Sequence, residues 1–174
     1  TIFVAEVAST VNELLLAHRK LEECKSDAEK LSILDGLMET YKGTLYRQTM
    51  FAEFERDVHA LCAKGEPLTA DVLNKTYMKL IRAYFGPKVV KDKQIAYEWM
   101  RIPHFYSSFY VYKYATGCSA AIAFSQDILS NGADNYLQFL KKGGSNYPLE
   151  LLNQSGINLN GTKPIEKTTA KKRT

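Results

Sequence analysis

Apolar residues recur with a helical period along most of this chain, and this periodicity restricts its fold more than any other feature. The opening segment TIFVAEVASTVNELL places apolar side chains at steps of three and four residues, at Val4, Val7, Val11 and Leu14. Such steps form one face of an α-helix, and the pattern predicts a first helix over residues 3–25. No alternating run of apolar and polar residues is long enough to indicate a strand. The sequence therefore predicts an all-α fold.

A second helical stretch follows the first almost directly. Ser26 is a good N-cap residue, because its hydroxyl can accept a hydrogen bond from the first turn of a helix. The helical pattern after it continues to Gly65. Gly36 and Gly43 lie inside this stretch, and glycine is a weak helix former. We therefore expect helix over most of this stretch but not one unbroken rod.

Capping and breaking residues also define the later helices. Thr69 and Gly86 bracket a helical segment with the usual start and stop signals. An aromatic segment follows and is interrupted by Pro103. Two short helices are then expected, in NGADNYLQFLKKGGSNYP and PLELLNQSGINL.

The length of 174 residues is enough for one domain with an apolar core, which we expect over residues 1–162. No apolar run approaches the length that a membrane span requires, so we expect no membrane partner. The chain has three scattered cysteines and no CxxC pair: Cys24, Cys62 and Cys118. This usage argues against a disulfide framework or a cysteine zinc site and predicts a reducing, cytoplasmic setting.

The net charge of +4 comes from the end of the chain. Residues 163–174 contain five basic side chains against Glu166 alone, whereas the charges of residues 1–162 balance. The expected domain thus carries no basic footprint for phosphates, and we expect no nucleic-acid partner. We interpret the basic segment as a solvated, disordered tail.

Glu6 is the first candidate for chemistry. It is surrounded in sequence by Phe3, Val4 and Val7, so we expect it to be partly buried on the first helix. Buried carboxylates are paired or bind metal. Ser9 and Glu13 lie on the same side of that helix and could support Glu6. A carboxylate on a solvated helix face is the simpler alternative.

The second candidate is the segment RIPHFYSSFYVYKYATG, residues 101–117. It combines His104 with several tyrosines, whose hydroxyls need partners when buried. If the segment is helical, Tyr110 and Tyr114 lie one turn apart on one face, and Tyr112 points nearly the opposite way. Such hydroxyls could donate to a developing oxyanion, although an aromatic core helix is the alternative interpretation.

Three segments, FVAEVASTVNELL, RQTMFAEFE and IPHFYSSFYVYKYATG, together resemble the oligoendopeptidase F group of the thimet-oligopeptidase-like zinc metallopeptidases. The resemblance extends from residue 2 to about residue 160. It implies a multi-helix, C-terminal portion of a helical peptidase domain that hydrolyses internal bonds of oligopeptides with one zinc ion.

The resemblance also implies roles for individual residues. Glu6 matches the third zinc ligand, and Ser9 and Glu13 would line or support that site. His104 matches a substrate-binding histidine. Tyr110 and Tyr114 best match the tyrosines that bind the scissile carbonyl, with Tyr112 as the alternative.

The HExxH motif of this family, which supplies two zinc ligands and the general base, does not occur in the chain. None of His18, His59 and His104 is followed by glutamate. We therefore expect a C-terminal fragment whose missing upstream portion carries HExxH, and which is inactive in isolation. The alternative function is a non-catalytic helical module that binds peptides or a partner protein through the surface around His104 and Tyr114.

Overall fold

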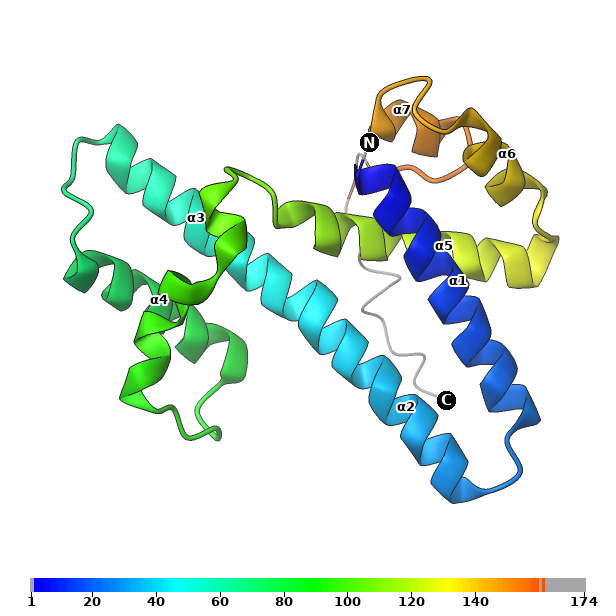
Figure 1. The fold of residues 1–174 in the computed structure, drawn as a ribbon, viewed down its shortest axis with the longest axis horizontal. Coiled ribbons are helices and arrows are strands. Elements are labelled where there is room, and N and C mark those ends of the chain that lie inside the picture. Colours follow the sequence, from blue (N-terminus) through cyan, green and yellow to red (C-terminus); the bar gives the residue numbers. More distant parts are fainter. Residues whose placement is uncertain (1, 160, 162–174) are drawn as a thin grey trace. The chain divides into compact units, whose positions relative to one another are not determined.

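The computed structural model describes residues 2–159 and 161, and within them it contains helices, turns and loops but no strand (Figure 1). This confirms the predicted all-α fold. The helices are α1 (Ile2–Glu23), α2 (Asp27–Thr40), α3 (Arg47–Ala63), α4 (Ala70–Phe85), α5 (Tyr112–Asn131), α6 (Asp134–Lys142) and α7 (Pro148–Asn153). None of these helices combines the length and apolarity needed to cross a membrane. The predicted basic tail, 163–174, lies outside the described residues.

The helix boundaries follow the predicted caps. The Ser26 hydroxyl accepts the Glu29 N–H at 3.3 Å, and the Thr69 hydroxyl accepts the Val72 N–H at 3.3 Å. The stretch after Ser26 is helical up to Ala63, but the turns at Tyr41–Tyr46 are π-helical (η1). The predicted interruption therefore takes the form of a widened helical turn around Gly43 rather than a break.

Two further short helices are of the 3₁₀ type, namely η2 (Lys93–Arg101) and η3 (Pro103–Tyr106). The chain forms two compact units. Unit 1 comprises Thr1–Leu45 and Lys113–Thr174, and unit 2 comprises Tyr46–Tyr112. Each unit has its own apolar core.

The core of unit 1 lies between α1, α5, α6 and α7. Its buried members from α1 and α5 are Phe3, Val4, Val7, Val11, Ala120, Ala121 and Phe124. Val4, Val7 and Val11 belong to the face that the helical period predicted, and Leu14, the fourth member of that face, is partly buried against the same core. The side chains that α5 contributes opposite them include alanines, which leave room for a neighbouring helix. From α6, Phe139 stacks close to Phe124, with ring centroids 4.9 Å apart.

The core of unit 2 contains a cluster of aromatic rings. Phe54 from α3 meets Tyr77 from α4 edge to face, with ring centroids 5.2 Å apart and planes at 87°. Trp99 from η2 contacts Phe54, and its ring N–H donates to the Asn74 side chain at 2.8 Å. Aromatic pairs of this kind add stability beyond the apolar area that they bury. Helices α3 and α4 and the segment η2 are joined in this way.

A buried carboxylate, Glu98, lies beside this aromatic core. Its oxygens accept hydrogen bonds from the Tyr77 hydroxyl at 2.7 Å and from Arg101 at 2.6 Å, and it also pairs with Arg47. Burial alone would raise the pKa of Glu98, but these donors outweigh burial and hold the pKa below its ordinary value of 4.5. The ionised form is therefore part of the fold of unit 2.

We expect acid to destabilise unit 2 through Glu98. Because its pKa in the folded state lies below the unfolded value, the stabilisation is complete above about pH 4.5 and is lost as the pH falls through the folded pKa. Glu98→Gln should lower the free energy of unfolding by about 1–3 kcal/mol at neutral pH and should flatten this acid dependence. The measurement is urea unfolding at several pH values, followed by the fluorescence of Trp99, the only tryptophan in the chain. Tyr77→Phe, which removes one donor, should give an intermediate pH dependence, and equal acid slopes for all three proteins would contradict the assignment.

Candidate active site

The predicted site residues lie in both compact units, and each unit is described by itself. Unit 1 contains Glu6, Ser9, Glu13 and Tyr114, and unit 2 contains His104, Tyr110 and Tyr112. The first group lies on α1 and α5. The second lies on η3, on the turn after it and on the first residue of α5.

Glu6 lies on α1 and is half-buried, which confirms the expected partial burial. It lies where α1 approaches Gly117 of α5. A Cβ atom added to Gly117 would lie 3.8 Å from both the Glu6 Cβ and the Val7 Cγ2. Val7 is fully buried, so packing fixes the position of this turn of α1. The Glu6 carboxylate therefore extends from a well-anchored backbone.

Ser9 and Glu13 relate to Glu6 in different ways. The Ser9 hydroxyl donates to the backbone carbonyl oxygen of Glu6 at 3.1 Å, so this bond is made to the main chain of Glu6. Glu13 follows seven residues later, about 10 Å further along the helix axis. At that separation the two carboxylates cannot bind the same ion directly.

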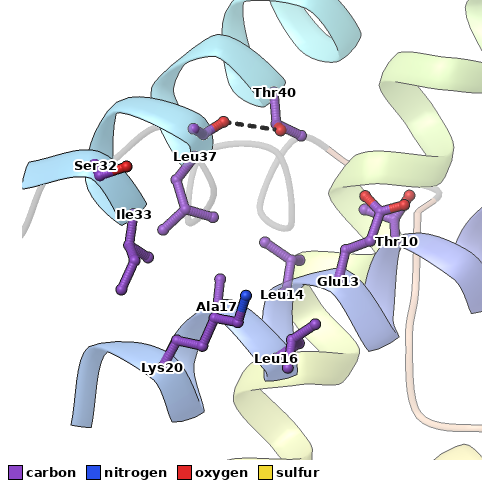
Figure 2. Close-up of a pocket in the computed structure, with 11 residues that line it drawn as sticks. Thr10, Glu13, Leu14, Leu16, Ala17, Lys20, Ser32, Ile33, Leu37 and Thr40 are labelled. Carbon is purple, nitrogen blue, oxygen red and sulfur yellow. Dashed lines mark hydrogen bonds between the residues drawn. The ribbon is translucent and has the colours of Figure 1, made fainter. Parts of the chain in front are cut away.

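Glu13 instead lines a groove of about 410 Å³ between α1 and α2. Figure 2 shows Leu14 and Ala17 of α1 facing Ile33 and Leu37 of α2 across this groove. The Thr40 hydroxyl donates to the Gly36 carbonyl oxygen at 3.0 Å. The groove is thus mainly aliphatic, and it is distinct from the surroundings of Glu6 at Gly117.

The buried cysteine, Cys118, supplies no nucleophile. Burial, together with the nearby Glu13 carboxylate, raises the pKa of the Cys118 thiol to about 11. The thiolate is the reactive form of cysteine, so Cys118 remains a protonated core residue at neutral pH. Cys24 and Cys62 are free thiols as well, and the predicted absence of disulfides holds for all three.

The expectation that Tyr110 and Tyr114 lie one turn apart on a single helix is wrong. Helix α5 begins only at Tyr112, and Tyr110 lies in the turn before it. Phe109 has a positive φ of 56°, a conformation that a right-handed helix cannot contain. The Tyr110 N–H donates to the Ser107 carbonyl oxygen at 3.1 Å, which closes a turn.

A buried glutamate stabilises this turn. The Phe109 N–H donates to the Glu55 carboxylate of α3 at 2.5 Å, and Glu55 is only 6% exposed. The Phe109 ring also packs against the His59 ring of α3 in a tilted arrangement, with ring centroids 4.5 Å apart. These contacts link α3 to a segment about 50 residues later in the chain. They explain why local spacing gave the wrong geometry for Tyr110.

Within unit 2 the structure brings His104 and Tyr110 together. Their rings stack with centroids 5.4 Å apart and planes at 24°. Tyr112 is exposed at the start of α5, and Tyr114 follows two residues later on the same helix. Positions two residues apart point to different sides of a helix, so Tyr112 and Tyr114 do not share a face.

Two residues of interest were missed by sequence reasoning, Glu55 and Gly117. The apolar neighbours of Glu55 in RQTMFAEFE were a signal of burial, but they could not identify its partner. Gly117 lies in the small-residue run TGCSAA, which is typical of close helix packing. Glu53, by contrast, accepts a hydrogen bond from the Tyr84 hydroxyl at 3.0 Å. Burial is the larger cause and this bond the second, and together they raise the pKa of Tyr84 to about 12.

Glu6 has the chemistry of a zinc ligand, since carboxylate oxygens bind zinc in proteins. Across residues 2–159 and 161, no three side chains of histidine, cysteine, aspartate or glutamate come together as a group that could hold a metal ion. Glu6 could therefore supply one ligand of a metal site, and residues outside this group would have to supply the other ligands.

Comparison with known proteins places this chain in a family. The model of peptidase family M3 matches residues 1–171, and the chain therefore belongs to peptidase family M3. It is 48% identical to Oligopeptidase PepF of Bacillus subtilis (strain 168) over 169 residues. It is 40% identical to the chromosomal Oligoendopeptidase F of Lactococcus lactis subsp. cremoris over 168 residues. The resemblance to the oligoendopeptidase F group is confirmed.

A solved structure shows the same helical fold. The crystal structure of oligoendopeptidase-F from Enterococcus faecium matches with a TM-score of 0.89 and 42% identity, over 96% of this chain and 33% of that chain. This chain covers 25% of the length of the Bacillus subtilis relative and 28% of the length of the Lactococcus lactis relative. This chain thus spans about a quarter to a third of these proteins. The roles of Glu6, His104 and the tyrosines stay predictions.

The contact of α1 with Gly117 gives a testable expectation. Gly117→Ala should be tolerated, because its Cβ would make ordinary 3.8 Å contacts with Glu6 and Val7 and because alanine is the better helix former. Gly117→Leu should lower the free energy of unfolding by about 1–3 kcal/mol, because the larger side chain overpacks this contact. Thermal unfolding followed by circular dichroism measures both. A stable Gly117→Leu protein would show that the two helices can separate there without cost.

Proposed function

We propose that this chain forms part of the catalytic domain of a zinc-dependent oligoendopeptidase that hydrolyses internal peptide bonds of oligopeptides. Membership of peptidase family M3 supports the reaction class. The names Oligopeptidase PepF and Oligoendopeptidase F, carried by relatives, support oligopeptides as the substrate class. Because this chain spans about a third or less of those relatives, the remaining part of the domain would be supplied by a longer polypeptide.

Helix α2 supports the existence of such a longer polypeptide. None of its residues is buried, and its apolar positions Leu31, Leu34 and Met38 are exposed. Their spacing of three and four residues places them on one face. An apolar helix face is normally covered, and we infer that the rest of the peptidase covers this one.

The observation that carries the proposal is the environment of Glu6. The Glu6 residue is half-buried on α1, and its Cβ atom lies beside Gly117 of α5. A carboxylate in such a place is normally paired or bound to metal. When bound, zinc would polarise the peptide carbonyl group and lower the pKa of a bound water molecule. Glu6 would supply one ligand, and an HExxH motif elsewhere in the polypeptide would supply the others and the general base.

The remaining predicted residues act on the substrate. His104, stacked on Tyr110, would contact the bound peptide. The hydroxyls of Tyr110 and Tyr114 would donate to the scissile carbonyl oxygen, whose negative charge grows in the transition state. The stacking of His104 on Tyr110 limits the motion of these two rings. The Tyr110 hydroxyl would therefore lose little freedom when the substrate binds. The chain in isolation would be inactive, because one carboxylate does not complete a catalytic zinc site.

The ligand assignment is tested in the full-length peptidase by Glu6→Gln. A neutral amide is a poor zinc ligand, so we expect this variant to lose most of its zinc on dialysis against a weak chelator. Glu13→Gln is the comparison variant: Glu13 lies about 10 Å further along the same helix and would support the site rather than bind the ion, so we expect it to lose less zinc than Glu6→Gln. Zinc is measured by mass spectrometry. If wild type and Glu6→Gln hold equal zinc, the assignment of Glu6 as a zinc ligand is wrong.

The tyrosine assignment is tested by single Tyr→Phe substitutions at positions 110, 112 and 114. Each keeps the ring and removes one hydroxyl. We expect Tyr110→Phe and Tyr114→Phe to lower kcat by about 10²–10³ with little change in KM, because the lost donor acts mainly in the transition state. Tyr112→Phe should be nearly silent. The measurement is turnover of one quenched-fluorescence peptide. If Tyr112→Phe lowers kcat strongly and Tyr110→Phe leaves it unchanged, this choice of donors is wrong.

A further inference from the structure

Phe109 has an unusual backbone conformation. It is the only non-glycine residue with positive φ, at 56°, among the residues that the structure describes. For a residue with a Cβ atom this conformation is strained, and it persists only where surrounding contacts impose it. The conformation turns the chain between His104 and Tyr110, the two residues assigned to the substrate.

The contact that imposes it comes from Glu55. Its carboxylate accepts the Phe109 N–H at 2.5 Å while being only 6% exposed. Burying a carboxylate is costly unless it is well hydrogen-bonded, and hydrogen bonds to an ionised acceptor are stronger than neutral ones. An apolar residue at position 55 would pack in the core of unit 2 without that cost. The glutamate therefore has a use other than packing.

The turn itself consists of successive backbone bonds. The Ser107 N–H donates to the His104 carbonyl oxygen at 3.0 Å, and the Tyr110 N–H donates to the Ser107 carbonyl oxygen at 3.1 Å. The bond from Phe109 to Glu55 attaches this turn to α3. The same turn brings the rings of His104 and Tyr110 into their 5.4 Å stack.

We propose that Glu55 is a positioning residue, which holds the turn in the conformation that places His104 and Tyr110 side by side for the peptide substrate. It acts through the backbone of Phe109 and does not touch the substrate. This inference rests on the proposed function, because it takes His104 and Tyr110 as substrate-contacting residues.

The test compares Glu55→Gln with Glu55→Met in the full-length peptidase. Both side chains fill the space of the glutamate, but only glutamine keeps an acceptor for the Phe109 N–H. We expect Glu55→Met to lower kcat by about 10–100-fold, since small misplacements of positioned groups cost up to about 10². Glu55→Gln should retain most of the activity. Glu53→Gln is the matched control, because Glu53 lies on the same helix but bonds Tyr84 of α4, and it should be normal.

Two further measurements separate positioning from simple stability. Hydrogen exchange followed by mass spectrometry should show faster exchange of the peptide containing Phe109 in Glu55→Met, while the urea midpoint followed by circular dichroism stays near the wild-type value. If activity falls only in proportion to the folded fraction, or if Glu55→Met is as active as wild type, the proposal is wrong.

A double mutant distinguishes this proposal from the proposed function. If Glu55 acts through Tyr110, then Glu55→Met should cost little more once Tyr110→Phe is present, because the two effects are not additive. Full additivity would overturn the positioning role. A normal Tyr110→Phe single variant would instead overturn the role of Tyr110 in the proposed function, whatever Glu55 does.

Discussion

The contact between α1 and α5 is the interaction on which unit 1 depends. Val7 and Val11 of α1 are fully buried, and α5 contributes Ala120 and Ala121 to the same core. Small residues let two helices approach closely, and at Gly117 the approach is close enough that an added Cβ atom would touch Glu6 and Val7. The carboxylate assigned to zinc thus extends from the most tightly packed side of α1. The core packing of this turn of α1 fixes the backbone from which it extends.

Unit 2 uses buried carboxylates in a different way. Glu98 binds Tyr77, Arg101 and Arg47 and so joins η2 to α4 and α3. Glu55 binds the backbone of a turn instead of a side chain. Each carboxylate overcomes its burial cost by accepting hydrogen bonds from segments distant in the chain. A polar group of this kind specifies one arrangement, since any other would leave a buried charge without donors.

The two units also differ in how they support function. In unit 1 the candidate ligand lies on a long helix whose apolar face is covered. In unit 2 the candidate substrate contact His104 lies on η3, and Tyr110 lies on the turn between η3 and α5. Functional residues are often found on such loops when a rigid scaffold supports them. Here the scaffold is α3, through Glu55 and His59.

The sequence by itself determined the helical class, the caps at Ser26 and Thr69, the partial burial of Glu6 and the family. All of these depend on local spacing or on motifs that can be read along the chain. Only the tertiary structure decided the geometry around Tyr110, because a hydrogen bond from Phe109 to Glu55, 54 residues away, overrides the helical spacing of the tyrosines. It also decided that Glu13 lines the groove between α1 and α2, with its carboxylate near Cys118 of α5. Contacts between distant residues set both outcomes, and a periodic pattern contains no information about them.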